Sequence, residues 1–217
     1  MIKAVVFDFD GLILDSETSV YNAIQEIFSE HSSHMPLEVW QQCIGTKDFL
    51  DPFEYLEEQI SKKVDRKGLQ SRHHERVVAM LEGTRALPGV EDYLEAAKEL
   101  GLKIGLATSS SRAWVTGYLE KLNLLPFFDC IKTADDVEHV KPDPALYRDA
   151  VSCLGVKPEE AIAFEDSANG ARAAKKAGLY CVVIPNEVTK GLVFGDIDHQ
   201  MATMAELQFK ELLKKFG

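Results

Sequence analysis

The chain changes its hydrophobic pattern twice. After Lys3 it opens with a short continuous apolar run, Ala4 to Phe7, which is typical of a strand buried on both faces of a sheet. From about residue 16 to residue 80 the apolar positions recur with helical periodicity and show no strand pattern. Prolines and glycines at Pro36, Gly45, Pro52 and Gly68 supply breaks or first-turn positions. The expected helices lie near 17–31, 36–44, 49–63 and 69–82.

After Pro88-Gly89 helices and strands alternate. Glycines at 101, 155 and 178 stand just past three of the expected helices, where a left-handed cap is common. Regular alternation of this kind is typical of a doubly wound, mainly parallel sheet. The pattern predicts helices over 90–100, 111–122, 143–154 and 168–177, and strands over 103–107, 130–133, 161–164 and 180–184.

The length of 217 residues suits one full core with a smaller appendage inserted in it. We assign residues 1–15 and 83–217 to one α/β core. Residues 16–82 form the expected all-helical insertion.

Composition narrows the class of protein. A hydrophobic share of 46% with 27% charged residues is that of a globular protein, and no apolar run is long enough to cross a bilayer. The apolar stretch Ala4 to Phe7 is too short for a signal peptide. A net charge of −11 without a Lys/Arg stripe argues against nucleic acid as a main partner. We therefore expect a cytoplasmic monomer with no membrane partner. A small anionic substrate is still compatible with this charge, but it would need local cations or a metal.

The cysteines and histidines show no metal-binding or disulfide spacing. Four cysteines are dispersed along the chain without a C-x-x-C pair, and the six histidines are scattered. We expect the cysteines to be reduced and mostly buried.

Polar residues stand at the ends of the expected strands or in the loops that follow them. They are Asp8 and Asp10 with Gly11, then Thr108, Ser109 and Ser110, then Lys141, and finally Glu165 with Asp166. Right-handed crossovers bring the carboxyl ends of parallel strands to one edge, where ligands bind. A single such group is often only a turn. The whole set in this order indicates a site.

Phosphoryl transfer explains these residue types. Asp8 can act as a nucleophile and form an aspartyl-phosphate, which divides one difficult displacement into two. Carboxylate oxygens of Asp8 and Asp166, the backbone carbonyl of Asp10, and Glu165 as a further candidate suit Mg²⁺. The metal would offset the repulsion between Asp8 and an anionic substrate.

The other residues of the set can complete this chemistry. Lys141 can neutralise phosphoryl charge, and the Thr108 hydroxyl and the Ser109 backbone N–H can donate to its oxygens. Asp10 can protonate the leaving oxygen and then deprotonate water. Gly11 lets the backbone turn sharply. Ser110 and Arg112 are candidate substrate contacts, or alternatively an N-cap region and an exposed arginine.

The chain resembles the haloacid dehalogenase-like superfamily, in its β-phosphoglucomutase-like branch of phosphatases. The resemblance rests on Asp8-x-Asp10-Gly11, Thr108-Ser109, Lys141-Pro142 and Glu165-Asp166-Ser167, with Leu14-Asp15-Ser16-Glu17 and Pro88-Gly89-Val90 as further matches. It implies a Rossmann-like core with a helical cap inserted after the first motif. The acid/base aspartate at Asp10 implies that the substrates are phosphate esters.

Two departures from the family concern the substrate. Val20 stands where many relatives have a histidine, which in the mutases assists closure and proton control. Lys47 stands where relatives often carry an arginine that grips a second phosphate. We count Glu17 and Lys47 as candidate substrate contacts from the cap. The leading hypothesis is a phosphatase of a small phosphorylated metabolite, such as a sugar phosphate, with a phosphosugar mutase and a non-catalytic metabolite-binding module as alternatives.

Overall fold

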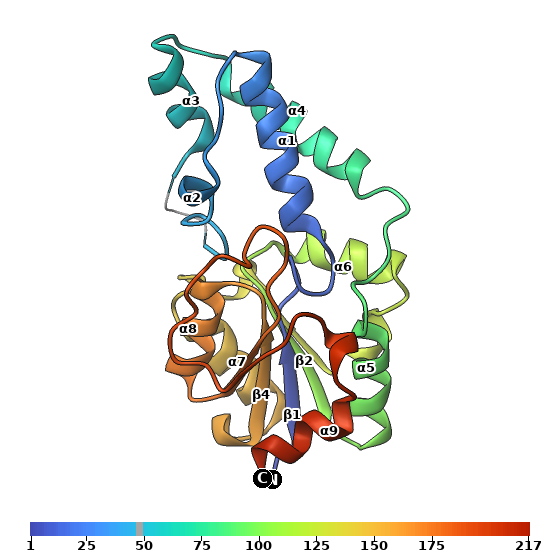
Figure 1. Ribbon diagram of the computed structural model, residues 1–217. Helices are drawn as coiled ribbons and strands as arrows, with labels where there is room; N and C mark the ends of the chain where they lie inside the picture. The colour runs from blue at the N-terminus through green and yellow to red at the C-terminus, as the bar shows by residue number, and fades with distance from the viewer. Residues whose placement is uncertain (47–49) are drawn as a thin grey trace.

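The computed structural model describes residues 1–46 and 50–217, and shows a layered core with a helical segment above one edge of its sheet (Figure 1). Six strands form one sheet in the order β3-β2-β1-β4-β5-β6, with every pair parallel. The predicted doubly wound parallel sheet is confirmed. The strands are β1 (Ala4–Phe7), β2 (Lys103–Ala107), β3 (Cys130–Lys132), β4 (Ala161–Glu165), β5 (Tyr180–Val183) and β6 (His199–Gln200).

Helices cover both faces of the sheet. The core helices are α5 (Val90–Glu99), α6 (Arg112–Lys121), α7 (Ala145–Leu154), α8 (Ala168–Ala177) and α9 (Phe209–Leu213). Along β1, Ala4 and Val6 join the apolar cluster that includes residues of α7 and α8, whereas Val5 and Phe7 join the cluster with α5 and α9. Successive side chains of a strand point to opposite faces. Burial on both faces therefore explains the unbroken apolar run at the N-terminus.

Glycine ends the core helices as the sequence predicts. Gly155 and Gly178 cap α7 and α8 with φ of +69° and +89°, and Gly101, just after α5, has φ of +69°. These left-handed values are accessible to glycine without strain.

The segment from residue 16 to 80, hereafter the helical segment, has its own apolar cluster. Its helices are α1 (Ser16–Glu30), α2 (Leu37–Trp40), α3 (Pro52–Ile60) and α4 (Arg66–Met80). Ile24, Phe28 and Leu56 are buried in the cluster, and arginines 72 and 76 of α4 pair with Glu30 of α1. The helix predicted over 36–44 is shorter, because the chain turns after Trp40 toward Gly45, which has φ of +75°.

One prediction about the cysteines was wrong. Cys130 and Cys153 form a disulfide, whereas Cys43 and Cys181 are free thiols. Cys130 begins β3 and Cys153 lies in the last turn of α7, which packs on β3, so their Cα atoms come within 6.3 Å. That separation suits a disulfide. Nothing in the local sequence marks the pair, since 23 residues separate them.

Within residues 1–46 and 50–217, no helix is both long enough and apolar enough to cross a bilayer.

Candidate active site

Polar side chains from several strand ends meet in one cavity between the sheet edge and the helical segment. Asp8 and Asp10 follow β1, Thr108 to Ser110 follow β2, and Asp166 follows β4. The cavity has a volume of 280 Å³. From the core it is lined by Asp8, Asp10, Thr108, Ser109, Ser110, Lys141 and Asp166, and from the helical segment by Glu17, Val20, Trp40, Cys43, Ile44, Gly45, Thr46, Leu50 and Pro52.

Lys141 is the buried cation of this site. Its peptide bond to Pro142 is cis, and its side chain is 1% exposed. The Nζ atom lies 2.6 Å from Asp8 Oδ1 and 2.6 Å from Glu165 Oε1. Burial alone would lower the pKa of Lys141, but the two carboxylates outweigh it and raise the pKa. Lys141 is therefore held as an ammonium beside Asp8.

Glu165 is fully buried and its oxygens already accept several hydrogen bonds. Oε1 accepts from Lys141 Nζ and from the Tyr147 hydroxyl at 2.5 Å. Oε2 accepts from the Ser167 hydroxyl at 3.2 Å and from the backbone N–H groups of Asp166 and Ser167. A Cβ on Gly170 would collide with this carboxylate, so the glycine of α8 makes room for it. These contacts fix the Glu165 carboxylate, which in turn holds the Lys141 ammonium in place.

The three acids Asp8, Glu165 and Asp166 could hold a divalent cation. Each offers an oxygen within 4.8 Å of the others, and all three are buried. Burial and the charge of Glu165 raise the pKa of Asp8 to about 7, against the opposing effect of Lys141. Burial and the charges of Asp8 and Glu165 likewise raise the pKa of Asp166. Among the residues that the structure describes, three buried carboxylates around one ammonium leave negative charge uncompensated, which fits Mg²⁺ and its preference for oxygen ligands.

The Asp10 carboxylate turns toward a separate set of donors. Oδ1 accepts from the Ser16 hydroxyl at 2.7 Å and from Trp114 Nε1 at 3.0 Å, and Oδ2 accepts from the Ser110 hydroxyl at 2.6 Å. These donors come from α1, from α6 and from the loop after β2. Asp10 is thus held at the border between the core and the helical segment, in the same cavity as Asp8.

The loop after β2 contacts both the core and the helical segment. The Ser110 backbone N–H donates to Thr108 Oγ1 at 3.0 Å, and the Ser109 hydroxyl donates to the Gly45 carbonyl at 3.0 Å. A Cβ on Gly45 would lie 2.7 Å from Ser167 Oγ, so glycine allows this close approach. α6 begins only at Arg112, three residues beyond Ser109.

The remaining candidate substrate contacts divide into three cases. Arg112 does not line the cavity; it is exposed and pairs with Asp136 at 2.6 Å and with the Ile131 carbonyl. Glu17 lines the cavity, and desolvation together with the charges of Asp10 and Asp8 raises its pKa to about 8. Lys47 lies outside the described residues.

Asn186 is a site residue that the sequence reasoning missed. Its Nδ2 donates to Asp166 Oδ2 at 2.7 Å and to the Gly11 carbonyl at 3.2 Å. It stands just after β5, so the rule that polar residues at strand ends mark the site would have found it. Tyr147 and Trp114 gave no such signal, because aromatic residues at helical spacing read as core.

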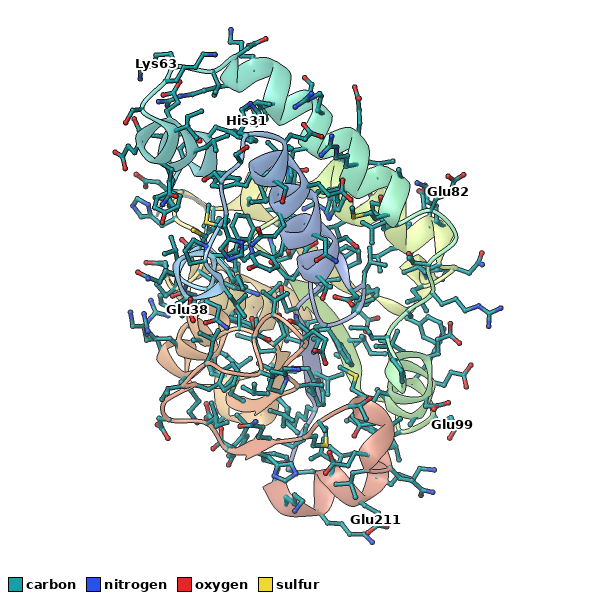
Figure 2. The ribbon with its side chains drawn as sticks, turned by 45° about the horizontal axis from the view of Figure 1, so that its top comes forward. His31, Glu38, Lys63, Glu82, Glu99 and Glu211 are labelled. Carbon is teal, nitrogen blue, oxygen red and sulfur yellow. A yellow bond between two sulfur atoms is a disulfide. The ribbon has the colours of Figure 1, made fainter. Side chains whose placement is uncertain are left out.

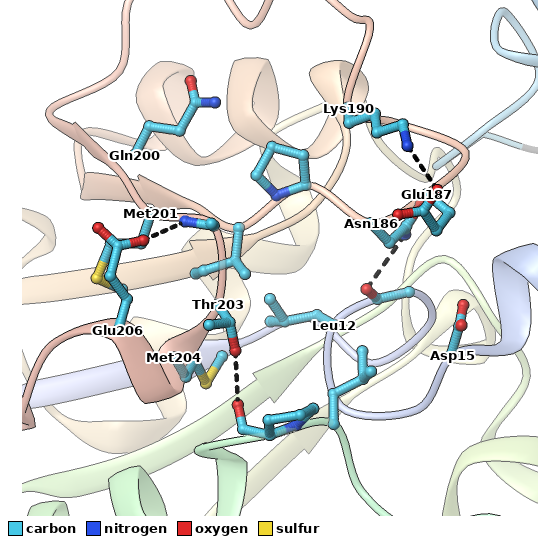
Figure 3. Close-up of a pocket in the computed structure, with 16 residues that line it drawn as sticks. Leu12, Asp15, Asn186, Glu187, Lys190, Gln200, Met201, Thr203, Met204 and Glu206 are labelled. Atoms are coloured by element: carbon cyan, nitrogen blue, oxygen red, sulfur yellow. Dashed lines mark hydrogen bonds and ion pairs between the residues drawn. The ribbon is translucent and has the colours of Figure 1, made fainter.

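A second cavity lies behind this site. It has a volume of 670 Å³ and is bounded by Gly11, Leu12, Asn186 and Met201, among others (Figure 3). Although it is the larger of the two, it holds none of Asp8, Lys141 or Asp166, so the smaller cavity is the one suited to chemistry.

Comparison with known proteins identifies the class. A family model described as "Haloacid dehalogenase-like hydrolase" matches residues 5–184. "Putative phosphatase YhcW" of Bacillus subtilis (strain 168) is 55% identical over 213 residues, which cover 98% of this chain and 97% of that protein. "Phosphorylated carbohydrates phosphatase" of Thermotoga maritima is 30% identical over 179 residues, 82% of each chain. The chain belongs to the haloacid dehalogenase-like hydrolases.

A solved structure refines this assignment. The crystal structure of "putative beta-phosphoglucomutase from Thermotoga maritima" has a TM-score of 0.77 and 28% identity, and the match covers 98% of this chain and 99% of that one. The chain lies in the β-phosphoglucomutase-like branch of the family, and it is a phosphatase. Membership of this class favours an enzyme over the alternative of a non-catalytic binding module.

Proposed function

We propose that this phosphatase hydrolyses a small phosphorylated metabolite, of the sugar phosphate class, with Mg²⁺ and through an aspartyl-phosphate on Asp8. The observation that carries the proposal is the convergence of Asp8, Lys141 and Asp166 in a cavity that also holds Asp10. The carbohydrate substrates named for the Thermotoga maritima relative support the substrate class.

In the first step an Asp8 oxygen attacks phosphorus while the bond to the ester oxygen breaks. Lys141 neutralises charge on the phosphoryl oxygens, and the Thr108 hydroxyl and the Ser109 backbone N–H donate to them. Asp10 enters this step as the protonated acid, exchanges one of its present donors for the leaving oxygen and gives that oxygen its proton. The products of this step are the free alcohol and phosphorylated Asp8.

In the second step water attacks phosphorus on the opposite side from Asp8. Asp10, now a carboxylate, takes a proton from that water, and Asp8 is released together with inorganic phosphate. Glu165 keeps Lys141 in place throughout, through the 2.6 Å contact between Oε1 and Nζ. Mg²⁺ held by Asp8, Asp166 and the Asp10 carbonyl would offset the negative charge that gathers on Asp8 and the phosphoryl group.

We propose that the helical segment, together with residues 81 and 82, forms a cap that spans residues 16–82, with residues 1–15 and 83–217 as the catalytic core. Its wall of the cavity is mainly apolar, from Val20, Trp40, Ile44 and Leu50, with Glu17 as a carboxyl group. A wall of this kind can exclude water and contact the carbon skeleton of a substrate, while Glu17 and Ser110 can bond its hydroxyls.

The test is a panel of hexose, pentose and hexitol phosphates, with release of inorganic phosphate measured in Mg²⁺ and in EDTA. We expect turnover of at least one sugar phosphate in Mg²⁺ and none in EDTA. Turnover that survives complete removal of divalent metal would refute the metal-dependent mechanism, and activity confined to phosphates without a carbohydrate would refute the substrate class.

A phosphosugar mutase is the second candidate, favoured by the likeness to the "putative beta-phosphoglucomutase" structure. A mutase must hold a bisphosphate at both ends and keep water away from the aspartyl-phosphate. Val20 stands where the assisting histidine of the mutases would be, on an apolar wall. We therefore favour discharge of the aspartyl-phosphate by water.

This choice predicts the outcome of one incubation. With β-glucose 1-phosphate and a trace of the 1,6-bisphosphate, we expect the enzyme to release inorganic phosphate or do nothing. Both products are followed over time, phosphate by colorimetry and glucose 6-phosphate by a coupled dehydrogenase. Glucose 6-phosphate that accumulates faster than free phosphate would establish the mutase instead.

Removal of the Asp166 carboxylate should weaken binding of the metal. We expect Asp166→Ala to raise the Mg²⁺ concentration needed for half-maximal activity, on the order of 10-fold or more, because fewer carboxylates bind the cation. The measurement is a Mg²⁺ titration of phosphate release. Asp135→Ala, which removes an acid that accepts from the Arg112 backbone N–H outside the cavity, is the matched control. A superimposable titration for Asp166→Ala would assign the ligand role to another group.

A further inference from the structure

The loop after β5, residues 184–190 and hereafter the β5 loop, contacts both the acidic cluster and the helical segment. At the acidic end, Asn186 Nδ2 donates to Asp166 Oδ2 at 2.7 Å and to the Gly11 carbonyl at 3.2 Å. Figure 3 shows Asn186 directed at the turn that contains Gly11 and Leu12. One amide group thus bonds to the segments that follow β4 and β1.

Glycine at position 11 makes this convergence possible. Its φ is +77°, and a Cβ there would collide with Asp166 Oδ2 and lie 2.5 Å from Asn186 Nδ2. The space beside the Gly11 backbone is therefore filled by the Asp166 and Asn186 side chains. Such close packing restricts the Asp166 carboxylate to a narrow range of positions.

Hydrogen bonds to the side-chain oxygen and from the backbone N–H of Asn186 determine the orientation of its amide group. Oδ1 accepts from the backbone N–H groups of Val188 at 2.9 Å and Thr189 at 3.0 Å. The Asn186 N–H in turn donates to Thr189 Oγ1 at 2.9 Å, and Thr189 is fully buried. Because only an oxygen can accept from two N–H groups, the amide must present its nitrogen to Asp166.

The other end of the β5 loop is packed against the helical segment. Val188 is 3% exposed and belongs to the apolar cluster of that segment, together with Trp40 and Ile44. Gln41 Nε2 donates to the Val188 carbonyl at 2.7 Å. The contact with Asp166 and the contact with the helical segment therefore lie two positions apart, with one residue between them.

We propose that Asn186 is a positioning residue that orients Asp166 for the metal, and that the β5 loop links this placement to docking of the helical segment. The inference rests on the metal site of the proposed function. Asn186 touches neither substrate nor reacting atoms, and acts through the second oxygen of Asp166. Partners of this kind orient metal ligands and affect affinity strongly.

The first test measures Mg²⁺ binding by calorimetry, without substrate. We expect Asn186→Ala to raise the dissociation constant on the order of 10- to 100-fold. Thr189→Val is the matched control: it removes a bond inside the β5 loop but leaves the Asn186 donor in place, and its effect should stay below about 10-fold. Asp166→Ala is the reference for loss of the ligand itself. Thermal melts confirm that each variant is folded.

These variants distinguish an error in the metal site from an error in the role of Asn186. If Asp166→Ala weakens binding and Asn186→Ala does not, the inference is wrong while the metal site stands. If Asp166→Ala leaves binding unchanged, the metal site is wrong and the role of Asn186 with it. Equal losses in Thr189→Val and Asn186→Ala would mean that an intact loop, not the amide donor, is what matters.

The second test concerns the link to the helical segment. We expect Mg²⁺ to slow hydrogen exchange at backbone amides of residues 40–45 and 187–190 in the wild type. In Asn186→Ala at a saturating Mg²⁺ concentration, exchange at residues 40–45 should stay as fast as without metal. The link between the metal site and the helical segment would be overturned by either of two results. One is wild-type exchange at residues 40–45 that is the same with and without Mg²⁺, and the other is slowing by Mg²⁺ that persists in Asn186→Ala.

Discussion

Asp8→Asn should abolish turnover, with a loss of more than about 10⁴-fold in kcat, because the amide is a poor nucleophile and cannot form the aspartyl-phosphate. The variant should fold normally. Burial already raises the pKa of Asp8 to about 7, so a neutral group of the same shape is tolerated there, and Lys141 keeps its contact with Glu165. The measurement is phosphate release on the best substrate of the panel, with circular dichroism as the check of folding.

The control for this prediction is Asp92→Asn. It makes the same chemical change on an exposed residue in the first turn of α5, which does not line the cavity. We expect wild-type rates from the control. Folded Asp8→Asn that keeps activity within about tenfold of the wild type would rule out Asp8 as the covalent nucleophile.

Asp10→Asn should lower the rate on the order of 10²- to 10⁴-fold, because proton transfer to the leaving oxygen is lost. The variant should fold normally and keep the backbone carbonyl of residue 10 in place. The new amide oxygen can accept from Ser16 and Trp114, and the Ser110 hydroxyl can rotate to accept from the new amide nitrogen. Single-turnover rates on aryl phosphates with good and poor leaving groups measure the effect, which should be smaller for good leaving groups.

Ser110→Ala is the matched control for Asp10. It removes one donor to the carboxylate but keeps the acid itself, so we expect a loss below about tenfold and no special dependence on the leaving group. If Asp10→Asn slows good and poor leaving groups equally, the proton donor is a different group.

Much of the core could be predicted because its signals are local or topological. Continuous apolar runs predict buried strands, and glycine after a helix predicts a left-handed cap, as at Gly155 and Gly178. β6 escaped prediction because His199 and Gln200 are only two residues and carry no periodicity. α2 is shorter than predicted because the loop after Trp40 approaches the core, where Gly45 accepts from Ser109.

For the site, too, one part could be predicted from the sequence and another could not. By itself the sequence determined which polar residues meet, because parallel strands bring their carboxyl ends together whatever the details of packing. That rule was enough to assemble Asp8, Asp10, Thr108, Lys141 and Asp166. It carries no information about the direction in which each side chain points.

Tertiary structure decided the partners of those side chains. It placed Arg112 beside Asp136 instead of in the cavity, and directed the Asn186 amide to Asp166. It also joined Cys130 to Cys153 across β3 and α7. Each of these contacts joins residues that lie between 20 and 24 positions apart in the chain. Their proximity follows from how helices and loops pack on the sheet, which no local pattern encodes.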